Sequence, residues 1–282
     1  MWNNWLVQIV RDWLSVWHNL QLIHEQIMNC SWIKKRELII KVKGAFMDQN
    51  LEFMARMPEE QLHVFVDTLI EKGGITETLS VSEDYKQYGK NYSKYWHRIE
   101  EEYRDFGSNT ITSFFSGPNT YKEILEKVLK QCKVDFHPSD SVEAMEWLLL
   151  ESIIKDMWEK LSQSERIALL SDLKNDVDNI DFNSIGGITS SMLIQVFRAG
   201  GFASYKITLI IVNAIAKTIL GRGLSLAANA SITRGLSVIV GPIGVILSAL
   251  WSVYDIAGPA YRVIIPCTIL IAAYRKMDST NC

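Results

Sequence analysis

Tryptophan recurs at helical spacing over the first thirty residues. Trp2, Trp5, Trp13 and Trp17 share one face, while asparagine, glutamine and aspartate occupy the other, and this pattern predicts an amphipathic helix. The tryptophan face is expected either to pack against protein or to anchor at a lipid interface. Its polar side carries one cation, Arg11, whereas interfacial helices usually carry several. Both interpretations stay open from the sequence.

Apolar positions continue at helical spacing to about residue 175 and resume at residue 189. Turn and cap signals separate the helices: Pro58 suits a first helical turn, Gly73 follows a helix end, and Thr120 and Ser162 suit N-cap positions. One helix is apolar over so broad a surface that it is expected to lie in a core, namely 142–161. The predicted helices are 48–72 in two parts, 92–106, 121–132, 142–161, 162–175, 189–197 and 205–220.

Charge divides the chain unevenly. Residues 182–282 hold eight lysines and arginines against two acidic residues, so this part carries +6, and because the whole chain carries −3 the preceding part carries −9. No acidic residue occurs between Phe182 and Tyr254. Such an asymmetry suits an anionic lipid surface or an acidic partner face.

Small residues repeat every four positions within this acid-free part. Four residues at that interval share one face of a helix and let a second helix approach closely. The same segment continues into a Gly-Pro-Ile-Gly sequence. The residues predicted to serve close packing or membrane contact are Gly223, Ala227, Ser231, Gly235, Gly241, Pro242 and Gly244.

Two uncharged or nearly uncharged segments follow each other near the C-terminus. Residues 235–254 are twenty residues without a charge, close to the length that crosses a bilayer. Residues 256–274 are interrupted by Arg262, and Pro266 is expected to kink or divide them. Asp255 lies seven residues before Arg262. We expect a buried ion pair between them that fixes the turn, or, in lipid, a functional element.

These patterns predict an all-α protein with three regions. Residues 1–45 form a Trp-rich amphipathic helix and a basic segment. Residues 46–181, the acidic region, form a multi-helix bundle. Residues 182–282, the basic third, form a glycine-rich apolar region resembling a helical hairpin. The length of 282 residues is sufficient to bury a substantial core.

No motif indicates catalysis, a cofactor or a metal. The five histidines show no His-Glu-x-x-His pattern, and Gly221 to Ser225 lacks the Gly-Lys-Ser/Thr ending of a phosphate loop. No Gly-x-Ser-x-Gly elbow occurs. The basic stretch 34–43 lies in no recognised nucleic-acid module, so a solvated helix face is favoured over a nucleic-acid partner. We therefore expect a non-enzymatic protein.

The cysteines and the N-terminus indicate the compartment. Cys30, Cys132, Cys267 and Cys282 are far apart and form no Cys-x-x-Cys pair, as expected for reduced thiols. The N-terminus lacks the basic start, continuous apolar run and cleavage site of a secretory signal. A cytoplasmic location, peripheral or integral at the inner membrane, is expected.

Several short motifs follow one another in order between residues 47 and 277. They are Asn50-Leu51-Glu52-Phe53, Glu59-Glu60-Gln61-Leu62, Trp96, Phe106-Gly107, Glu151, Trp158, Gly241-Pro242-Ile243-Gly244, Ala260-Tyr261-Arg262-Val263, Ile265-Pro266 and Arg275-Lys276-Met277. In this order they resemble the YaaW-like family of bacterial proteins, and the Trp-rich start lies outside the resemblance. The family is grouped with ubiquinol–cytochrome c chaperone-like domains, so the resemblance implies an assembly factor and supplies no catalytic residues.

Two functions are compatible with the sequence. In the first, the apolar C-terminal region associates with or inserts into a membrane, as a conditional membrane-perturbing or pore-forming effector that forms homo-oligomers. In the second, a soluble chaperone or assembly factor binds the apolar helix of a membrane-complex client. Membrane lipid is the expected partner of the first, and a client helix that of the second.

Overall fold

The computed structural model describes residues 47–73, 79, 81–108, 119–176, 189–221, 245 and 261–280. The elements assigned within these residues are helices, which confirms the all-α prediction. They are η1 (Gln49–Arg56), α3 (Glu59–Gly73), α5 (Glu83–Tyr88), η2 (Tyr92–Tyr95), α6 (Trp96–Phe106), α8 (Tyr121–Gln131), α9 (Val142–Lys160), α10 (Gln163–Leu173), η3 (Lys174–Asp176), α11 (Ser190–Ala199), α12 (Gly201–Leu220) and α15 (Tyr261–Thr280).

Local cap signals determine where several helices begin. The hydroxyl of Thr120 accepts a hydrogen bond from the N–H of Glu123, and the Glu123 carboxylate accepts one from the N–H of Thr120, so a capping box starts α8. Ser162 and Glu165 form the same arrangement at α10. Ser141 caps α9. These caps satisfy N–H groups that have no partner inside the helix, and they confirm the predicted starts of the three helices.

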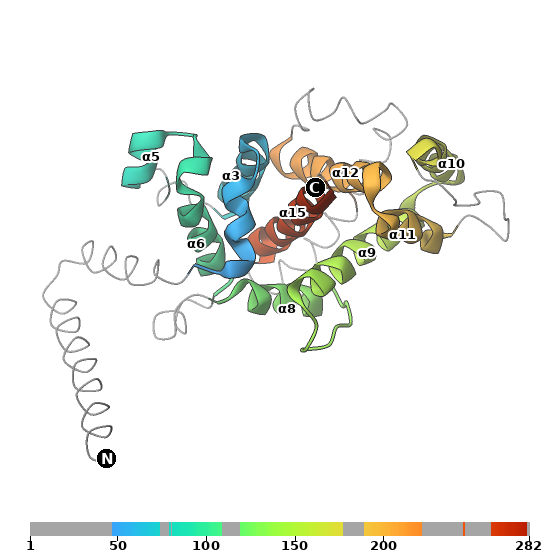
Figure 1. The fold of residues 1–282 in the computed structure, drawn as a ribbon, viewed down its shortest axis with the longest axis horizontal. Coiled ribbons are helices and arrows are strands. Elements are labelled where there is room, and N and C mark those ends of the chain that lie inside the picture. Colours follow the sequence, from blue (N-terminus) through green and yellow to red (C-terminus); the bar gives the residue numbers. More distant parts are fainter. Residues whose placement is uncertain are drawn as a thin grey trace, which may run out of the picture. The chain divides into compact units, whose positions relative to one another are not determined.

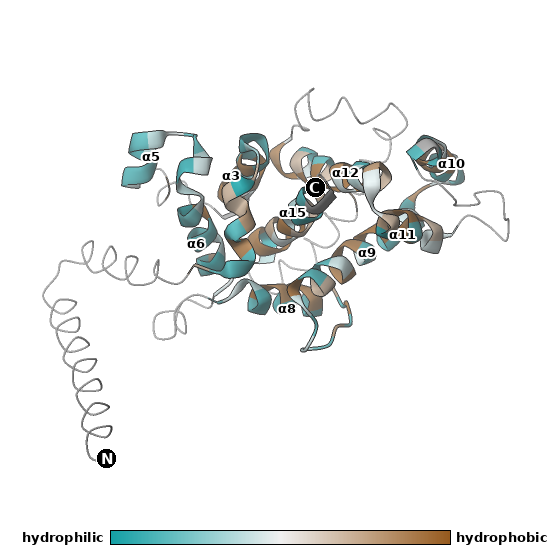
Figure 2. Ribbon diagram, in the orientation of Figure 1, coloured by the Kyte–Doolittle hydropathy of each residue, from teal (hydrophilic) through white to brown (hydrophobic). Residues whose placement is uncertain are grey.

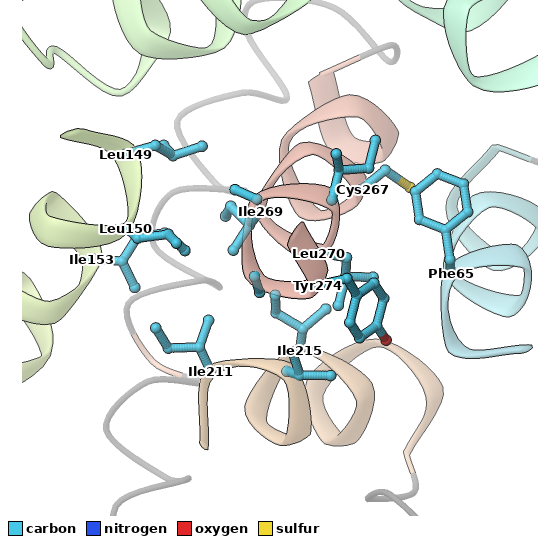
Figure 3. Packing of buried hydrophobic residues seen from close by; sticks show 14 of the residues in the cluster. Phe65, Leu149, Leu150, Ile153, Ile211, Ile215, Cys267, Ile269, Leu270 and Tyr274 are labelled. Atoms are coloured by element: carbon cyan, nitrogen blue, oxygen red, sulfur yellow. The ribbon is translucent and has the colours of Figure 1, made fainter. Parts of the chain in front are cut away.

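The helices pack around α15 (Figure 1). It contacts α3, α6, α8, α9 and α12, and every residue from 263 to 274 is buried. Figure 3 shows Phe65 of α3 on one side of α15 and Leu150 and Ile153 of α9 on the opposite side. Ile211 and Ile215 of α12 approach a further side. A helix that is apolar all round is expected to lie inside a core, and α15 does.

α15 runs through Pro266 without a break. Proline has no N–H to donate to the carbonyl four residues earlier, which is the carbonyl of Arg262. Pro266 is nevertheless buried among the surrounding helices, in the second turn of α15. The packing of the helix on all sides offsets the loss of one hydrogen bond. Pro266 therefore does not divide α15, so of the two predicted effects division is wrong and a kink stays a prediction.

Two glycines form the corner between α11 and α12. Gly200 and Gly201 have φ values of 79° and 64°, a left-handed conformation that side chains with a Cβ rarely adopt. α12 then begins at Gly201, four residues before the predicted start at Tyr205. Of residues 203–216, all but Tyr205 are buried. The corner therefore directs a long apolar helix back into the core.

The described residues from Asp48 to Thr280 belong to one compact unit. Within this unit two helices of the basic third pack against the acidic region: α12 packs against α3, and α15 packs against α3 and α9. Figure 2 shows hydrophobic surfaces on the helices that meet around α15, whereas α5 is hydrophilic. Residues 222–244 and 246–260 lie outside the described residues. The predicted glycine-rich hairpin therefore stays a prediction.

Candidate functional site

Among the described residues, three of the ion pairs that join the acidic region to the basic third have the same polarity. In each pair the carboxylate belongs to residues 46–181 and the cation to residues 182–282. Thus an acidic partner for part of the basic third is supplied by the same chain. The pairs are Glu146–Arg275, Glu151–Arg198 and Asp176–Lys206.

The pair with the most buried carboxylate lies at the C-terminal half of α15. Glu146 is 3% exposed; its carboxylate lies 2.8 Å from Arg275 Nε and accepts a 2.6 Å hydrogen bond from the Tyr121 hydroxyl. The Arg275 guanidinium also donates to the carbonyl of Asn50 and lies over the ring of Phe53, 4.4 Å from its centroid. Burial raises the pKa of Glu146, and Arg275 counteracts that rise. Because a buried charge needs a partner, this network fixes α15 to η1, α8 and α9.

A second buried network lies where η1, α6 and α8 meet. The Asp48 carboxylate accepts hydrogen bonds from the N–H groups of Asn50 and, at 2.5 Å, of Tyr121. The N–H of Asp48 donates to Glu100 over 3.4 Å, and Arg104 Nε lies 2.5 Å from the Glu100 carboxylate. Burial raises the pKa of Glu100 to about 7, although Arg104 lowers it. The network holds the N-terminus of α8 in place and leaves Glu100 inaccessible, at 1% exposure.

α12 is the described helix with the length and apolar composition to cross a membrane. A core helix of a soluble protein meets the same criteria, and 72% of its apolar window is buried in the protein. Phe202, 49% exposed at its N-terminal turn, stacks on Tyr205 with ring centroids 6.1 Å apart. Lys206 Nζ lies 2.5 Å from Asp176 Oδ2 and 4.9 Å from the Phe202 ring centroid. This end of α12 thus combines aromatic rings with a cation, as residues at membrane interfaces do.

An open pocket of about 440 Å³ lies between α9 and α11. On α9 the pocket is lined by Ala144, Trp147, Leu148 and Glu151, which are spaced three or four residues apart and so share one face of the helix. The guanidinium of Arg198 forms a two-point ion pair with the Glu151 carboxylate at its edge. Lys276 of α15 lies over the ring of Trp147, 4.1 Å from the centroid. The pocket is lined by Asp140, Ala144, Trp147, Leu148, Glu151 and Arg198.

Most of the residues predicted as functional lie outside the described residues. Arg262 is described: it is exposed in the first turn of α15. Since Asp255 is not described, the Asp255–Arg262 ion pair stays a prediction. The other predicted residues outside the described ranges are Trp2, Trp5, Trp13, Trp17, Gly223, Ala227, Ser231, Gly235, Gly241, Pro242 and Gly244.

In the described part of the chain, no group of three or more histidine, cysteine, aspartate or glutamate side chains is placed to hold a metal ion. Two glutamates of α9 serve as ion-pair partners. Glu146 pairs with Arg275, and Glu151 pairs with Arg198. Their arrangement stabilises contacts between helices.

Sequence reasoning missed the partners of Arg275 and Lys206. One signal was present: both residues are cations in apolar helices, and a buried cation requires an acidic partner. The sequence does not say which acid that is, because Glu146 lies 129 residues from Arg275 and Asp176 lies 30 residues from Lys206. Only the packing of the helices brings these residues together.

Comparison with known proteins identifies relatives in bacteria. A UPF0174 protein of Helicobacter pylori strain J99 is 38% identical over 241 residues, which cover 83% of this chain and 94% of the relative. A UPF0174 protein of Helicobacter pylori strain 26695 is 34% identical, over 71% of this chain and 97% of its own. The UPF0174 protein YaaW of Escherichia coli K12 is 28% identical, over 83% of this chain and 96% of its own. No family model and no solved structure matches the chain. The chain belongs to the UPF0174 family, which includes YaaW, as the resemblance predicted.

Proposed function

We propose that this chain is a non-enzymatic helical protein whose basic third associates with a membrane, and that α12 is the element that enters lipid. One observation carries the proposal: α12 is a twenty-residue apolar helix whose N-terminal turn exposes Phe202, stacked on Tyr205 and beside Lys206. Aromatic and cationic side chains favour the boundary between headgroups and acyl chains. The rest of α12 is suited to the acyl region.

Insertion of α12 is conditional in this proposal. Its apolar side chains already avoid water by packing on α15 and α3. A bilayer provides an equally apolar environment, so transfer costs little for these side chains once the packing contacts are replaced. The polar contacts of α12 then determine whether the helix is more stable packed in the protein or inserted in the bilayer. A membrane-perturbing or pore-forming effector is the finer version, in which several copies insert together.

The proposal is tested by fractionating cells that contain the untagged protein. We expect the protein in the membrane fraction at the inner membrane, with a portion that resists both carbonate and high salt. Purified protein should float with anionic vesicles, and a pore-forming version should release a trapped dye. Complete recovery in the soluble fraction, together with no flotation, would contradict the proposal.

The open pocket between α9 and α11 favours a second candidate function. Ala144, Trp147 and Leu148 offer an apolar strip along one helix face, the kind of surface on which an amphipathic helix docks. A chaperone or assembly factor for a membrane complex would hold a client helix there. Crosslinking a photoreactive residue at Leu148 in cells should then capture a subunit of a membrane complex. Capture of lipid-associated copies alone would favour the first function.

A further inference from the structure

Resting on the proposed function, the geometry points to an electrostatic latch that holds α11 and α12 against the acidic region and that an anionic lipid surface opens. The latch consists of the ion pairs Asp176–Lys206 and Glu151–Arg198. Lipid phosphates compete with the two carboxylates for the two cations. The moving unit is α11 with α12.

The Asp176–Lys206 pair is the inner part of the latch. Both side chains are mostly buried, with Lys206 at 8% and Asp176 at 15% exposure. The pair ties the second turn of α12 to η3, which ends the acidic region. If Asp176 were removed, Lys206 would be a buried cation without that partner, a strongly unfavourable state. Because Lys206 lies near the N-terminal end of α12, its side chain can reach the lipid headgroups when α12 lies in the bilayer.

The Glu151–Arg198 pair is the outer part. Arg198 is the penultimate residue of α11, and its side chain is 62% exposed, so lipid phosphates can approach it in the closed state. Guanidinium groups bind phosphate with the same two-point geometry that they use for carboxylates. An anionic surface can therefore replace Glu151 first. The pair to Asp176 then follows as α12 departs.

The corner between the helices supports movement as a unit. Gly200 and Gly201 both have positive φ, and a Cβ built at either position would meet no atom within 4 Å. The space beside both glycines is therefore open where a Cβ would lie. On the far side, α11 contacts α9 through Phe197 and Trp147, whose ring centroids lie 4.9 Å apart. That contact separates with the Glu151–Arg198 pair, before the Asp176–Lys206 pair opens.

α15 lacks this arrangement and stays in place. The side chain of Glu146, the carboxylate that pairs with α15, is 4% exposed and binds both Arg275 and the Tyr121 hydroxyl. Thr268, in the middle of α15, lies 2.7 Å from the Tyr103 hydroxyl of α6. The Glu146 carboxylate and Thr268 are closed to a lipid surface, whereas Arg198 of the Glu151–Arg198 pair is exposed. The latch therefore distinguishes α12 from α15.

The test compares variants for flotation with vesicles made of equal parts phosphatidylglycerol and phosphatidylcholine. Asp176→Asn is expected to half-saturate at a roughly tenfold lower lipid concentration than the wild type, because Lys206 loses its buried partner. Glu151→Gln should shift the midpoint less, by about two- to threefold, since that pair is exposed. Asp135→Asn and Glu143→Gln make the same charge changes at exposed positions without an ion pair in the described structure, and they should match the wild type.

A double variant separates a latch from simple loss of folding. Asp176→Asn with Lys206→Met removes both charges and leaves an apolar side chain that the core accepts. Its midpoint should return to the wild-type value or above. Inorganic phosphate at matched ionic strength should not open the latch, because a soluble ion offers no apolar phase for α12; opening by phosphate alone would contradict the lipid assignment.

Three outcomes would overturn the latch. One is an Asp176→Asn midpoint equal to that of the wild type while the wild type floats, which leaves the proposed function standing. Another is a double variant that floats as readily as Asp176→Asn, which would indicate loss of folding. The third is flotation by neither the wild type nor Asp176→Asn, which would contradict both the latch and the proposed function.

Discussion

α12 and α15 are two apolar helices of the same length, yet the fold treats them differently. Each spans twenty residues of the basic third. α15 is enclosed by five other helices, whereas α12 exposes an aromatic residue at its start and is held there by an ion pair to η3. Apolar composition thus predicts burial but does not identify what buries a helix. The positions of the cations and of their acidic partners distinguish α15, which stays in the core, from α12, which we propose can leave it.

The largest expected effect concerns the fixed helix. Arg275→Ala should lower the free energy of unfolding by about 3 to 5 kcal/mol, because it leaves Glu146 charged and buried without its guanidinium partner. Urea unfolding followed by circular dichroism measures this change. Arg56→Ala is the matched control: Arg56 pairs over 3.5 Å with Asp278 at the same end of α15, but both side chains are exposed. The control should cost less than about 1 kcal/mol, and equal losses would contradict the difference in burial.

A second effect concerns pH and α6, one of the helices that contact α15. Burial raises the folded-state pKa of Glu101 on α6 from 4.5 to about 7, although Arg98 counteracts this. Between these values the folded protein binds more protons than the unfolded chain, so this residue's contribution to stability falls as pH rises through that window. Glu101→Gln removes the effect. The variant should gain roughly 2 to 3 kcal/mol relative to the wild type between about pH 4.5 and pH 7.5.

Thermal or urea unfolding over this pH range measures the gain. Glu100 has a similarly raised pKa of about 7 and remains in the variant, so only the difference between the two proteins isolates Glu101. A difference that stays constant with pH would show that Glu101 does not titrate near neutrality. Such a result would weaken the view that the surroundings of α15 are closed to water.

The smallest effect on stability concerns the helix that is proposed to leave. Phe202→Ala should change the free energy of unfolding by no more than about 0.5 kcal/mol, because the ring is half exposed. The same change should raise the lipid concentration needed for half-maximal flotation by about tenfold, since one aromatic anchor is lost. Ile167→Ala removes an equally exposed apolar side chain from α10 and should not change flotation. Equal effects of both changes would contradict a specific role for the start of α12.

Local features of the fold were predictable from sequence because their causes are local. Thr120 and Ser162 cap helices through hydrogen bonds with residues three positions away. The apolar side chains of α9 cover a broad part of its surface, which predicted that this helix lies in the core. The path of α15 through Pro266 was not predictable. A proline is tolerated there because neighbours from five helices enclose the segment, and no pattern within the segment reveals those neighbours.

The candidate site was less predictable for the same reason. The basic third could be recognised by its charge, and the apolar nature of α12 was evident. The acids that meet Arg198, Lys206 and Arg275 come from a region with a separate helical pattern. The positive charge of the basic third therefore indicated an acidic partner. Part of that partner is the acidic region of the same chain, which only the fold reveals.

The most direct test of the central claim asks which apolar helix meets lipid. A diazirine-bearing amino acid is placed at Leu209 of α12 or, in a separate variant, at Leu270 of α15, both of which are buried in the folded protein. Each variant is irradiated in the presence of anionic vesicles. We expect lipid adducts at position 209 and crosslinks only to protein at position 270. Lipid adducts at neither position, or equally at both, would contradict the central claim.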